Sequence, residues 1–342
     1  MAGSSGTHII LQSPETDIAV LETARRGNLT RGFGFDWRDV AAVLNVADDH
    51  IGTDGISNIE DLARIKGLVA RAARKLLVLN GEDPRCVGMA DEAEAEHIFY
   101  VTMATDPGSL IKAHIAAGGM AATLRPDDGG ALIEFHDGGE VTRILLASDL
   151  PSAFGSKAMH NVQNAMFAVA LGHGMGASIA DILAGLLALK PNHQDMPGRL
   201  DFFTGFPFLV ILDYAHNADK FNAVSAVVNQ LEYSGRRIVA FTSPGNRTDP
   251  HLDNLAATAA QSTYNHYICF RRHDLRGRGP REVPECLRNG LIAAGIPTEN
   301  TSVVPIEEDA ANAALDMAQP GDIIALLYMD HDKIWELLRA PQ

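Results

Sequence analysis

The chain has 342 residues, which exceeds the size at which a single hydrophobic core usually stops growing, so we expect two domains. Apolar residues make up 46% and charged residues 21% of the sequence, a composition that excludes an intrinsically disordered chain. The formal net charge is −15, which argues against non-specific binding to nucleic acid or to an anionic membrane.

Cysteine usage and hydropathy indicate the compartment. The three cysteines, Cys86, Cys269 and Cys286, lie far apart and have no metal-ligand spacing, as expected of a reduced protein. There is no signal peptide and no apolar run long enough to cross a bilayer. We therefore expect a cytoplasmic protein with no nucleic-acid partner and no membrane partner.

The run Ile18 to Glu22 predicts a buried strand that ends in a carboxylate, and an Arg- and Gly-rich segment follows it. A second apolar run, Val40 to Val46, predicts another buried strand, followed by an acidic loop that contains His50. Ligands bind at the carboxyl ends of strands in open α/β sheets, so Glu22 and His50 face one crevice if their strands are neighbours. The alternative is a solvent-facing Glu22.

The next predicted element is a helix that begins at Asn58, a good N-cap residue. Ile59, Leu62 and Val69 form an apolar stripe at spacings of three and four, and Lys66 falls inside this stripe. A lysine there must pair with an acid, extend its head to water, or lose its charge through a lowered pKa. With the preceding acidic loop it suits a site for metal and phosphate, while an ordinary extended lysine remains the alternative.

The rest of the first half predicts short strands and few helices. The expected strands are Leu76–Asn80, His97–Met103 and three pieces around Ala121, Ala131 and Val141, and the expected helices are Ser109–Ala117, one opening at His160 and Ile179–Leu189. The succession of strands without long helices predicts an antiparallel extension of the first sheet.

The helix that opens at His160 carries two asparagines. Asn161 lies where a polar side chain can cap the helix, whereas Asn164 lies one turn further and can hydrogen-bond a planar ligand edge such as adenine. The segment Lys190 to Arg199 contains two prolines and a glycine, so we place a domain boundary there, giving domains 1–189 and 190–342.

The second domain alternates strands and helices at a regular spacing. The expected strands are Leu209–Asp213, Arg237–Phe241, His266–Phe270, a short one at Val303 and Asp322–Leu327, and the expected helices are Ala218–Leu231, Leu252–Gln261, Arg281–Ala294, Ile306–Met317 and one ending near Arg339. This alternation predicts a Rossmann-like domain with a mostly parallel sheet. The GxGxxG fingerprint is absent, so dinucleotide binding is not indicated.

Four motifs in order resemble the Mur ligase superfamily: the Lys66 helix, HNxxN at His160 to Asn164, PGR at Pro197 to Arg199, and a strand followed by DYAHN at Asp213 to Asn217. Within that superfamily the chain is similar to the Mur-ligase-like part of the cyanophycin synthetase family. The segments that carry this similarity begin at Ala19, Asn45 and His273. The resemblance implies an α/β fold with a truncated Mur-ligase-like central domain and a Rossmann-like C-terminal domain.

The resemblance also implies ATP-dependent amide formation through an acyl phosphate, with arginine attached to an aspartate side-chain carboxylate of an acidic peptide or polymer. It implies that Lys66 becomes a carbamate, which turns a misplaced cation into an anion suited to Mg²⁺. The implied residues are Lys66, His50 and His216 for catalysis, Glu22, His50 and Lys66 for the metal, Asn161, Asn164, Arg199, Asp213 and Asn217 for ATP, and Arg25, Arg26, Arg272, Arg276 and Arg278 for the substrate. For the basic stretch from Arg271 to Arg278, a solvated loop is the alternative.

The sequence departs from the family pattern in its phosphate-binding loop. No GxxGKT/S motif precedes Ile18, and the GSSG at Gly3 to Gly6 has no lysine to neutralise phosphates. The ATP-grasp region of cyanophycin synthetases is also absent, Arg26 replaces a glycine, and Ala218 replaces a proline.

Three hypotheses follow. The first is a ligase. The second is a catalytically incomplete homologue or fragment that binds substrate or a complete synthetase. The expected protein partner is either a further copy of this chain or a complete synthetase. The third is a metal-dependent hydrolase that uses Glu22, His50 and Asp49, which leaves DYAHN and HNxxN unexplained.

Overall fold

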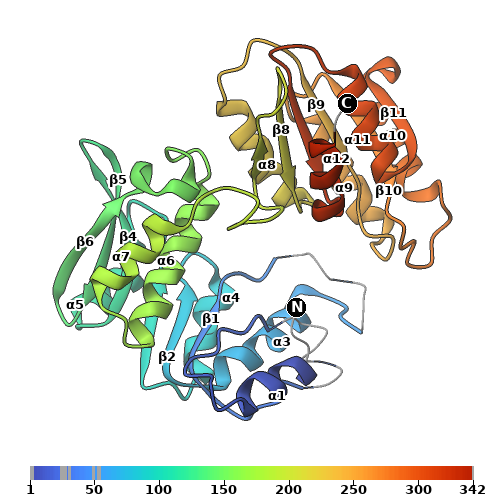
Figure 1. Cartoon of the computed structure of the whole chain (residues 1–342). Helices are drawn as coiled ribbons and strands as arrows, with labels where there is room; N and C mark the ends of the chain where they lie inside the picture. Colours follow the sequence, from blue (N-terminus) through green and yellow to red (C-terminus); the bar gives the residue numbers. More distant parts are fainter. Residues whose placement is uncertain (1–3, 24–28, 30–31, 48–50, 52–54, 341–342) are drawn as a thin grey trace. The chain divides into compact units, whose positions relative to one another are not determined.

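The structure is a computed structural model of the chain, and it describes residues 4–23, 29, 32–47, 51 and 55–340. The chain folds into two compact units: unit 1 comprises Met1–Ala153 and Met159–Leu187, and unit 2 comprises Phe154–Ala158 and Ala188–Gln342 (Figure 1). No helix of the described residues is both long enough and apolar enough to cross a bilayer.

Unit 1 is built on a six-stranded sheet with the order β1-β2-β3-β4-β5-β6. The strands are β1 (Arg38–Val43), β2 (Ala73–Asn80), β3 (His97–Val101), β4 (Met120–Asp127), β5 (Gly130–Asp137) and β6 (Glu140–Leu146). The first four are parallel, and β5 and β6 extend the sheet antiparallel. The predicted antiparallel extension is confirmed.

Helices cover both faces of this sheet (Figure 1). The helices of unit 1 are α1 (Ser4–Gln12), α3 (Ile59–Arg71), α4 (Pro84–Gly88), α5 (Gly108–Ala116), α6 (Met159–Gly174) and α7 (Ile179–Ala188), with short 3-10 turns at Met89–Glu92, Ala147–Asp149 and Pro151–Ala153. Residues of α3, α4 and α5 pack on one face, and residues of α6 and α7 pack on the other. Alternate strand residues therefore enter two different cores, as expected of buried parallel strands.

Local signals set the start of α3. The side chain of Asn58 accepts a hydrogen bond from the backbone N of Asp61 at 2.9 Å, and Glu60 and Asp61 occupy the first turn. Both features stabilise a helix N-terminus. The predicted start at Asn58 is confirmed.

The prediction of a strand at Ile18 to Glu22 is wrong for this structure, where the segment is neither strand nor helix. Ile18 is 56% exposed and Val20 is 90% exposed. A strand needs hydrogen-bonded neighbours, and no strand among the described residues pairs with this segment. The helix α1, which the sequence did not predict, precedes it.

Unit 2 is a second six-stranded sheet with the order β11-β10-β9-β12-β8-β7. The strands are β7 (Asp201–Phe203), β8 (Leu209–Asp213), β9 (Arg237–Phe241), β10 (His266–Arg271), β11 (Thr301–Ile306) and β12 (Ile323–Leu327). The helices are α8 (Ala218–Gln230), α9 (Asp249–Ala260), α10 (Glu282–Ala293), α11 (Glu307–Met317) and α12 (His331–Arg339), with a 3-10 turn at Thr298–Asn300. All strands are parallel except β7, an edge strand that the sequence did not predict.

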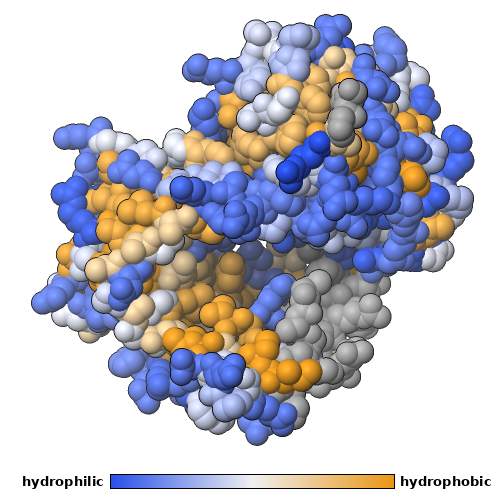
Figure 2. All heavy atoms as spheres, viewed as in Figure 1, coloured by the Kyte–Doolittle hydropathy of each residue, from blue (hydrophilic) through white to orange (hydrophobic). Residues whose placement is uncertain are grey.

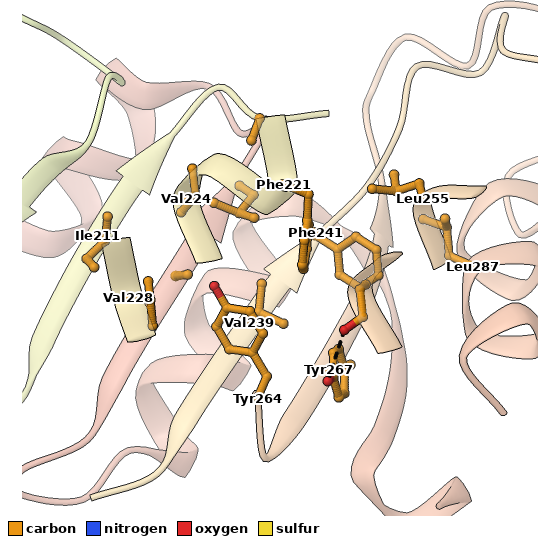
Figure 3. Packing of buried hydrophobic residues seen from close by; sticks show 14 of the residues in the cluster. Ile211, Phe221, Val224, Val228, Val239, Phe241, Leu255, Tyr264, Tyr267 and Leu287 are labelled. Atoms are coloured by element: carbon orange, nitrogen blue, oxygen red, sulfur yellow. Dashed lines mark hydrogen bonds between the residues drawn. The ribbon is translucent and has the colours of Figure 1, made fainter. Parts of the chain in front are cut away.

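The core of unit 2 also has two layers. Helices α8, α9 and α10 pack on one face and α11 and α12 on the other. Figure 3 shows Phe221 of α8 against Phe241 of β9, with ring centroids 5.2 Å apart. Ala158 is buried in this core, and Phe154 packs on Phe202 at a centroid distance of 4.4 Å. The short segment Phe154–Ala158 therefore belongs to the fold of unit 2.

Candidate functional site

A cavity of about 400 Å³ runs along β1 in unit 1 and contains two of the predicted site residues. Glu22 and Lys66 both line it, together with Asn45 at the end of the β1 segment. Nζ of Lys66 donates to the backbone O of Asn45 at 2.6 Å. Lys66 is half-buried, so its position on the apolar stripe of α3 directs it into the cavity.

The donor atoms at this cavity fit a hard divalent cation. The carboxylate of Glu22 and the backbone carbonyl of Asn45 are oxygen ligands of the type that Mg²⁺ prefers. A carbamate on Lys66 would add a third oxygen donor and keep an N–H for the bond to Asn45. The other predicted ligand, His50, lies outside the described residues, as do Asp49, Arg25 and Arg26.

The two asparagines of the HNxxN motif lie inside α6, which begins at Met159. Asn161 therefore does not cap the helix, which was the alternative role for it, and its predicted contact with ATP stays a prediction. Its side chain is buried and donates to the backbone O of Ser152 at 2.8 Å. Asn164 is exposed, and its Nδ2 donates to Oδ1 of Asn161 at 3.4 Å, which leaves the carbonyl of Asn164 available to a ligand. Asn161 thus orients Asn164.

In unit 2 the PGR and DYAHN motifs lie together at the carboxyl end of β8. The backbone N of Leu200 donates to Oδ2 of Asp213 at 2.9 Å, and the N of Tyr214 donates to the O of Gly198 at 3.0 Å. Gly198 has φ of +65°, which favours glycine. The side chain of Arg199 is exposed, with its guanidinium carbon 5.5 Å from the centre of the Tyr214 ring.

The histidine of DYAHN is held by its neighbours. Nδ1 of His216 donates to the backbone O of Tyr214 at 2.8 Å, and the His216 ring lies 4.6 Å from the ring of Tyr328. Asn217 is the N-cap of α8 and accepts from the N of Lys220 at 3.0 Å. This bond accounts for Asn217 structurally; its predicted contact with a nucleotide stays a prediction.

Residues that follow four parallel strands meet at one edge of the sheet. After β9, Oγ of Ser243 donates to the backbone O of His216 at 3.3 Å. After β10, Nη1 of Arg272 donates to the backbone O of Tyr328, which follows β12, at 3.0 Å. This carboxyl edge is where open α/β sheets bind ligands, so the predicted roles of Asp213, His216 and Arg272 in a ligand site stay predictions for this edge.

Comparison with known proteins shows which family unit 2 resembles. Residues 198–327 match the family model of the Mur ligase glutamate ligase domain. The second unit is therefore similar to the Mur ligase glutamate ligase domain. The cyanophycin synthetases of Nostoc sp. (strain PCC 7120 / SAG 25.82 / UTEX 2576) and Trichormus variabilis are 33% and 34% identical, each over 95% of this chain and 35% of that protein. The chain therefore spans about a third of the length of these relatives.

A solved folylpolyglutamate synthase from Mycobacterium tuberculosis has the same fold, with a TM-score of 0.62 and 17% identity over 91% of this chain and 66% of that one. Together these matches confirm the resemblance to the Mur ligase superfamily and, within it, to cyanophycin synthetase. They also confirm the predicted α/β fold class.

In unit 2 the three predicted substrate arginines already have partners. Arg278 donates to Gly245 O, Arg247 O, Asp249 and Glu282, so it fastens the loop after β10. Arg276, with φ of +48°, donates to Asp274. A substrate carboxylate would have to compete with these acceptors, and Arg276, which is exposed, is better placed to exchange partners than Arg272 or Arg278. The substrate role of all three stays a prediction.

Sequence reasoning missed Glu307, the first residue of α11. Its side chain is 2% exposed and accepts from Nη1 of Arg272 at 2.6 Å and from the N of Asp330 at 2.9 Å. With His273 and Glu308 it forms a group of possible metal donors. Arg272 and Lys333 already neutralise these carboxylates, so we assign the group to the support of the loop after β10.

Burial raises the pKa of Asp213 from 3.8 to about 6, although the N–H of Leu200 and the charge of Arg199 act in the opposite direction. An acid with a raised folded-state pKa destabilises the fold when it ionises. We therefore expect the Asp213 contribution to the free energy of unfolding to fall as the pH rises from about 4 to about 6.

Urea unfolding of wild type and Asp213→Asn at several pH values measures this effect. The variant should lose part of the pH dependence in that window, because an amide does not ionise. Asp219→Asn, on the exposed surface of α8, is the control. An identical pH dependence for wild type and Asp213→Asn would show that Asp213 ionises normally.

Proposed function

We propose that the chain is the nucleotide- and metal-handling part of an ATP-dependent carboxylate–amine ligase of the cyanophycin synthetase type. The observation that carries this proposal is the combination of 33% identity to a cyanophycin synthetase over 95% of the chain with Glu22 and Lys66 in one cavity. If the activity had been lost, Glu22 and Lys66 would be expected to be replaced by other residues. Both still match the family pattern.

In unit 1 we assign Glu22 and the carbamate of Lys66 to the binding of Mg²⁺. Mg²⁺ held there would neutralise the charge that develops on the γ-phosphoryl group of ATP during its transfer. Lys66 is held by Asn45, so its nitrogen keeps a fixed position in the cavity. The free amide carbonyl of Asn164 would accept from the adenine amino group.

In unit 2 we assign Asp213 to the ribose and Arg199 to the phosphates. The carboxylate of Asp213 is fixed by Leu200 N, and the exposed guanidinium of Arg199 has the geometry for bidentate contact with a phosphate. His216 is positioned by Tyr214 and Tyr328 and would orient the reacting groups.

The substrates we propose are an aspartate side-chain carboxylate of an acidic peptide or polymer and the α-amine of arginine. The carboxylate takes the γ-phosphoryl group to give an acyl phosphate, and the amine then displaces phosphate to form the amide. The loop after β10 offers the exposed Arg276 to an acidic acceptor, and Arg272 would do so only by giving up its pair with Glu307. The three free cysteines, of which Cys86 and Cys269 are buried, suit a reducing cytoplasm.

Mg²⁺-dependent release of ADP from ATP tests this function, with arginine and a short aspartate-rich acceptor present. We expect release that requires both arginine and acceptor, together with a peptide product heavier by one arginine residue. Lysine in place of arginine checks amino acid selectivity. An equal rate of ADP release with and without acceptor and arginine would contradict a ligase and indicate a nucleotidase.

A second candidate is a catalytically incomplete homologue that binds substrate or a complete synthetase. The absence of a GxxGKT/S motif from the sequence favours it, because the lysine of that loop neutralises the β- and γ-phosphates. Such a homologue would bind the acidic acceptor without turning over ATP, so acceptor binding by isothermal titration combined with no ADP release distinguishes it from the ligase.

A further inference from the structure

A second cavity, of about 460 Å³, lies in unit 2 beside the edge strand β11. Among the described residues β11 pairs only with β10, and α10 packs next to both strands (Figure 1). The strands β10, β9 and β12 separate β11 from β8, the strand that leads into DYAHN. Four strand spacings amount to roughly 19 Å, so this cavity is distinct from the predicted ATP residues of unit 2. The predicted substrate arginines of the loop after β10 do not line it either.

One wall of the cavity is a polar face of α10. Arg281 directly precedes the helix, and the wall continues with Glu285, Arg288 and Asn289. Residues at these intervals share one face of a helix, while the other face of α10 packs in the core of unit 2. The spacing of charges along α10 therefore gives the cavity two guanidiniums and one carboxylate. Two positive charges and one negative charge leave a net charge of +1, in a chain whose formal net charge is −15.

The guanidinium of Arg288 is held in place and keeps two nitrogens for a ligand. Its Nε donates to Oγ1 of Thr301 at 3.1 Å, and no described residue accepts a hydrogen bond from its Nη1 or Nη2. Thr301 is buried, and its hydroxyl donates to the backbone O of Thr298 at 2.8 Å, which fixes the position of the acceptor. The two Nη groups at the end of the guanidinium have the geometry for bidentate contact with a carboxylate.

Glu285 and Ser302 offer acceptors to a ligand. Oε1 of Glu285 accepts from Nε of Arg281 at 2.6 Å, and Oε2 of Glu285 has no partner among the described residues. Ser302 of β11 also lines the cavity, and its Oγ lies 3.2 Å from Nε2 of His266. A hydroxyl has one donor and two acceptor sites, so this bond leaves Ser302 able to accept from a ligand. An ammonium group has three donors and would find acceptors in both side chains.

The lining of the cavity favours a small hydrophilic ligand. Among the described residues that line it, Val303 alone is apolar. Figure 2 shows hydrophobic side chains on the surface around α1 of unit 1, where Ile9 and Leu11 are exposed, and the cavity beside α10 offers no comparable surface. Burial of apolar area drives the docking of apolar ligands, so such a ligand would gain little here.

We propose that this cavity binds a free dicarboxylic α-amino acid, with glutamate as the best fit. Two carboxylates and one ammonium group are the counterpart of the two guanidiniums and one carboxylate on α10. The α-carboxylate contacts the Nη groups of Arg288, the ammonium group contacts Oε2 of Glu285, and the side-chain carboxylate contacts Arg281. The two arginines are about 10 Å apart along the helix axis, which favours the longer glutamate over aspartate. This site is additional to the proposed ligase reaction and does not depend on it.

Isothermal titration of the full chain with L-glutamate, without ATP, tests the proposal. Glutarate is the matched ligand, because it has the same two carboxylates and no ammonium group. We expect L-glutamate to bind at least ~3-fold more tightly than glutarate, since the contact with Glu285 is partly exposed to solvent. L-lysine should not bind. No binding of L-glutamate at ~10 mM, or equal binding of L-lysine, would overturn the proposal.

Variants of α10 locate the ligand. Glu285→Gln should lower the affinity for L-glutamate to that for glutarate and should not weaken glutarate binding, because only the ammonium contact is lost. Arg288→Ala should weaken both ligands at least ~10-fold. Arg281→Ala keeps the bond between Arg288 and Thr301 and should weaken both ligands at least ~3-fold, whereas Arg339→Ala at the exposed end of α12 should change neither. Unchanged affinity for L-glutamate in both Arg281→Ala and Arg288→Ala would refute this site.

Discussion

Replacing Lys66 by alanine should lower Mg²⁺-dependent ADP release by ~10²–10³-fold, the usual loss when one group that stabilises transition-state charge is removed. The side chain reaches the cavity of Glu22 and is held by the backbone O of Asn45. Lys66→Arg should be equally impaired, because a guanidinium keeps a positive charge but cannot form a carbamate. A coupled spectrophotometric assay of ADP at saturating ATP measures both variants.

Arg64→Ala is the matched control for Lys66. Arg64 lies on the same helix, has a largely exposed side chain and forms an ion pair with Asp61. Its loss should change ADP release by less than about twofold, because exposed pairs contribute little. If Lys66→Ala also changes ADP release by less than about twofold, Lys66 takes no part in the reaction.

Replacing Glu307 by alanine should lower the free energy of unfolding by about 3 kcal/mol, at the lower end of the range for breaking a buried ion pair. The Glu307 carboxylate is 2% exposed and holds both Arg272 and the backbone N of Asp330. Arg272 keeps its bond to Tyr328 O and is 24% exposed, which limits the loss. Urea unfolding followed by circular dichroism measures the change.

Two further variants show whether the loss of stability in Glu307→Ala comes from the lost charge or from the lost buried contacts. Glu307→Gln keeps an oxygen for Asp330 N and should cost about 1–2 kcal/mol. Glu308→Ala removes the next residue of α11, which pairs with Lys333 at the surface, and should cost no more than about 1 kcal/mol. Equal destabilisation by Glu307→Ala and Glu308→Ala would mean that the free energy of unfolding depends on the total charge of α11 and not on the buried ion pair of Glu307.

The sequence predicts well where the signals are local. Asn58 caps α3 through a bond to a residue three positions on, and the spacing of Leu62 and Val69 places Lys66 on the buried side. In unit 2 the alternation of apolar runs predicts the strands and helices of a parallel sheet. Such features depend on contacts within one element, so a single sequence contains them.

The predictions failed where contacts between residues far apart in the sequence determine the local structure or the partner of a side chain. Ile18 to Glu22 has strand composition, but a strand forms only with a neighbour in space, which composition does not encode. Asn161 was placed at a helix start, whereas α6 begins at Met159 and Ser152 O fixes the side chain. Glu307 pairs with Arg272 across 35 positions, so no local motif identified it.

The route of the chain through the two units limits how the protein can be divided. Because Phe154–Ala158 packs in unit 2 and Met159–Leu187 returns to unit 1, the polypeptide passes from one unit to the other three times. No single cut yields two whole folding units. A recombinant fragment that starts at residue 190 would lack Ala158 and leave Phe202 without Phe154. A fusion partner or protease site is therefore better placed in a surface loop within one unit than at the apparent junction.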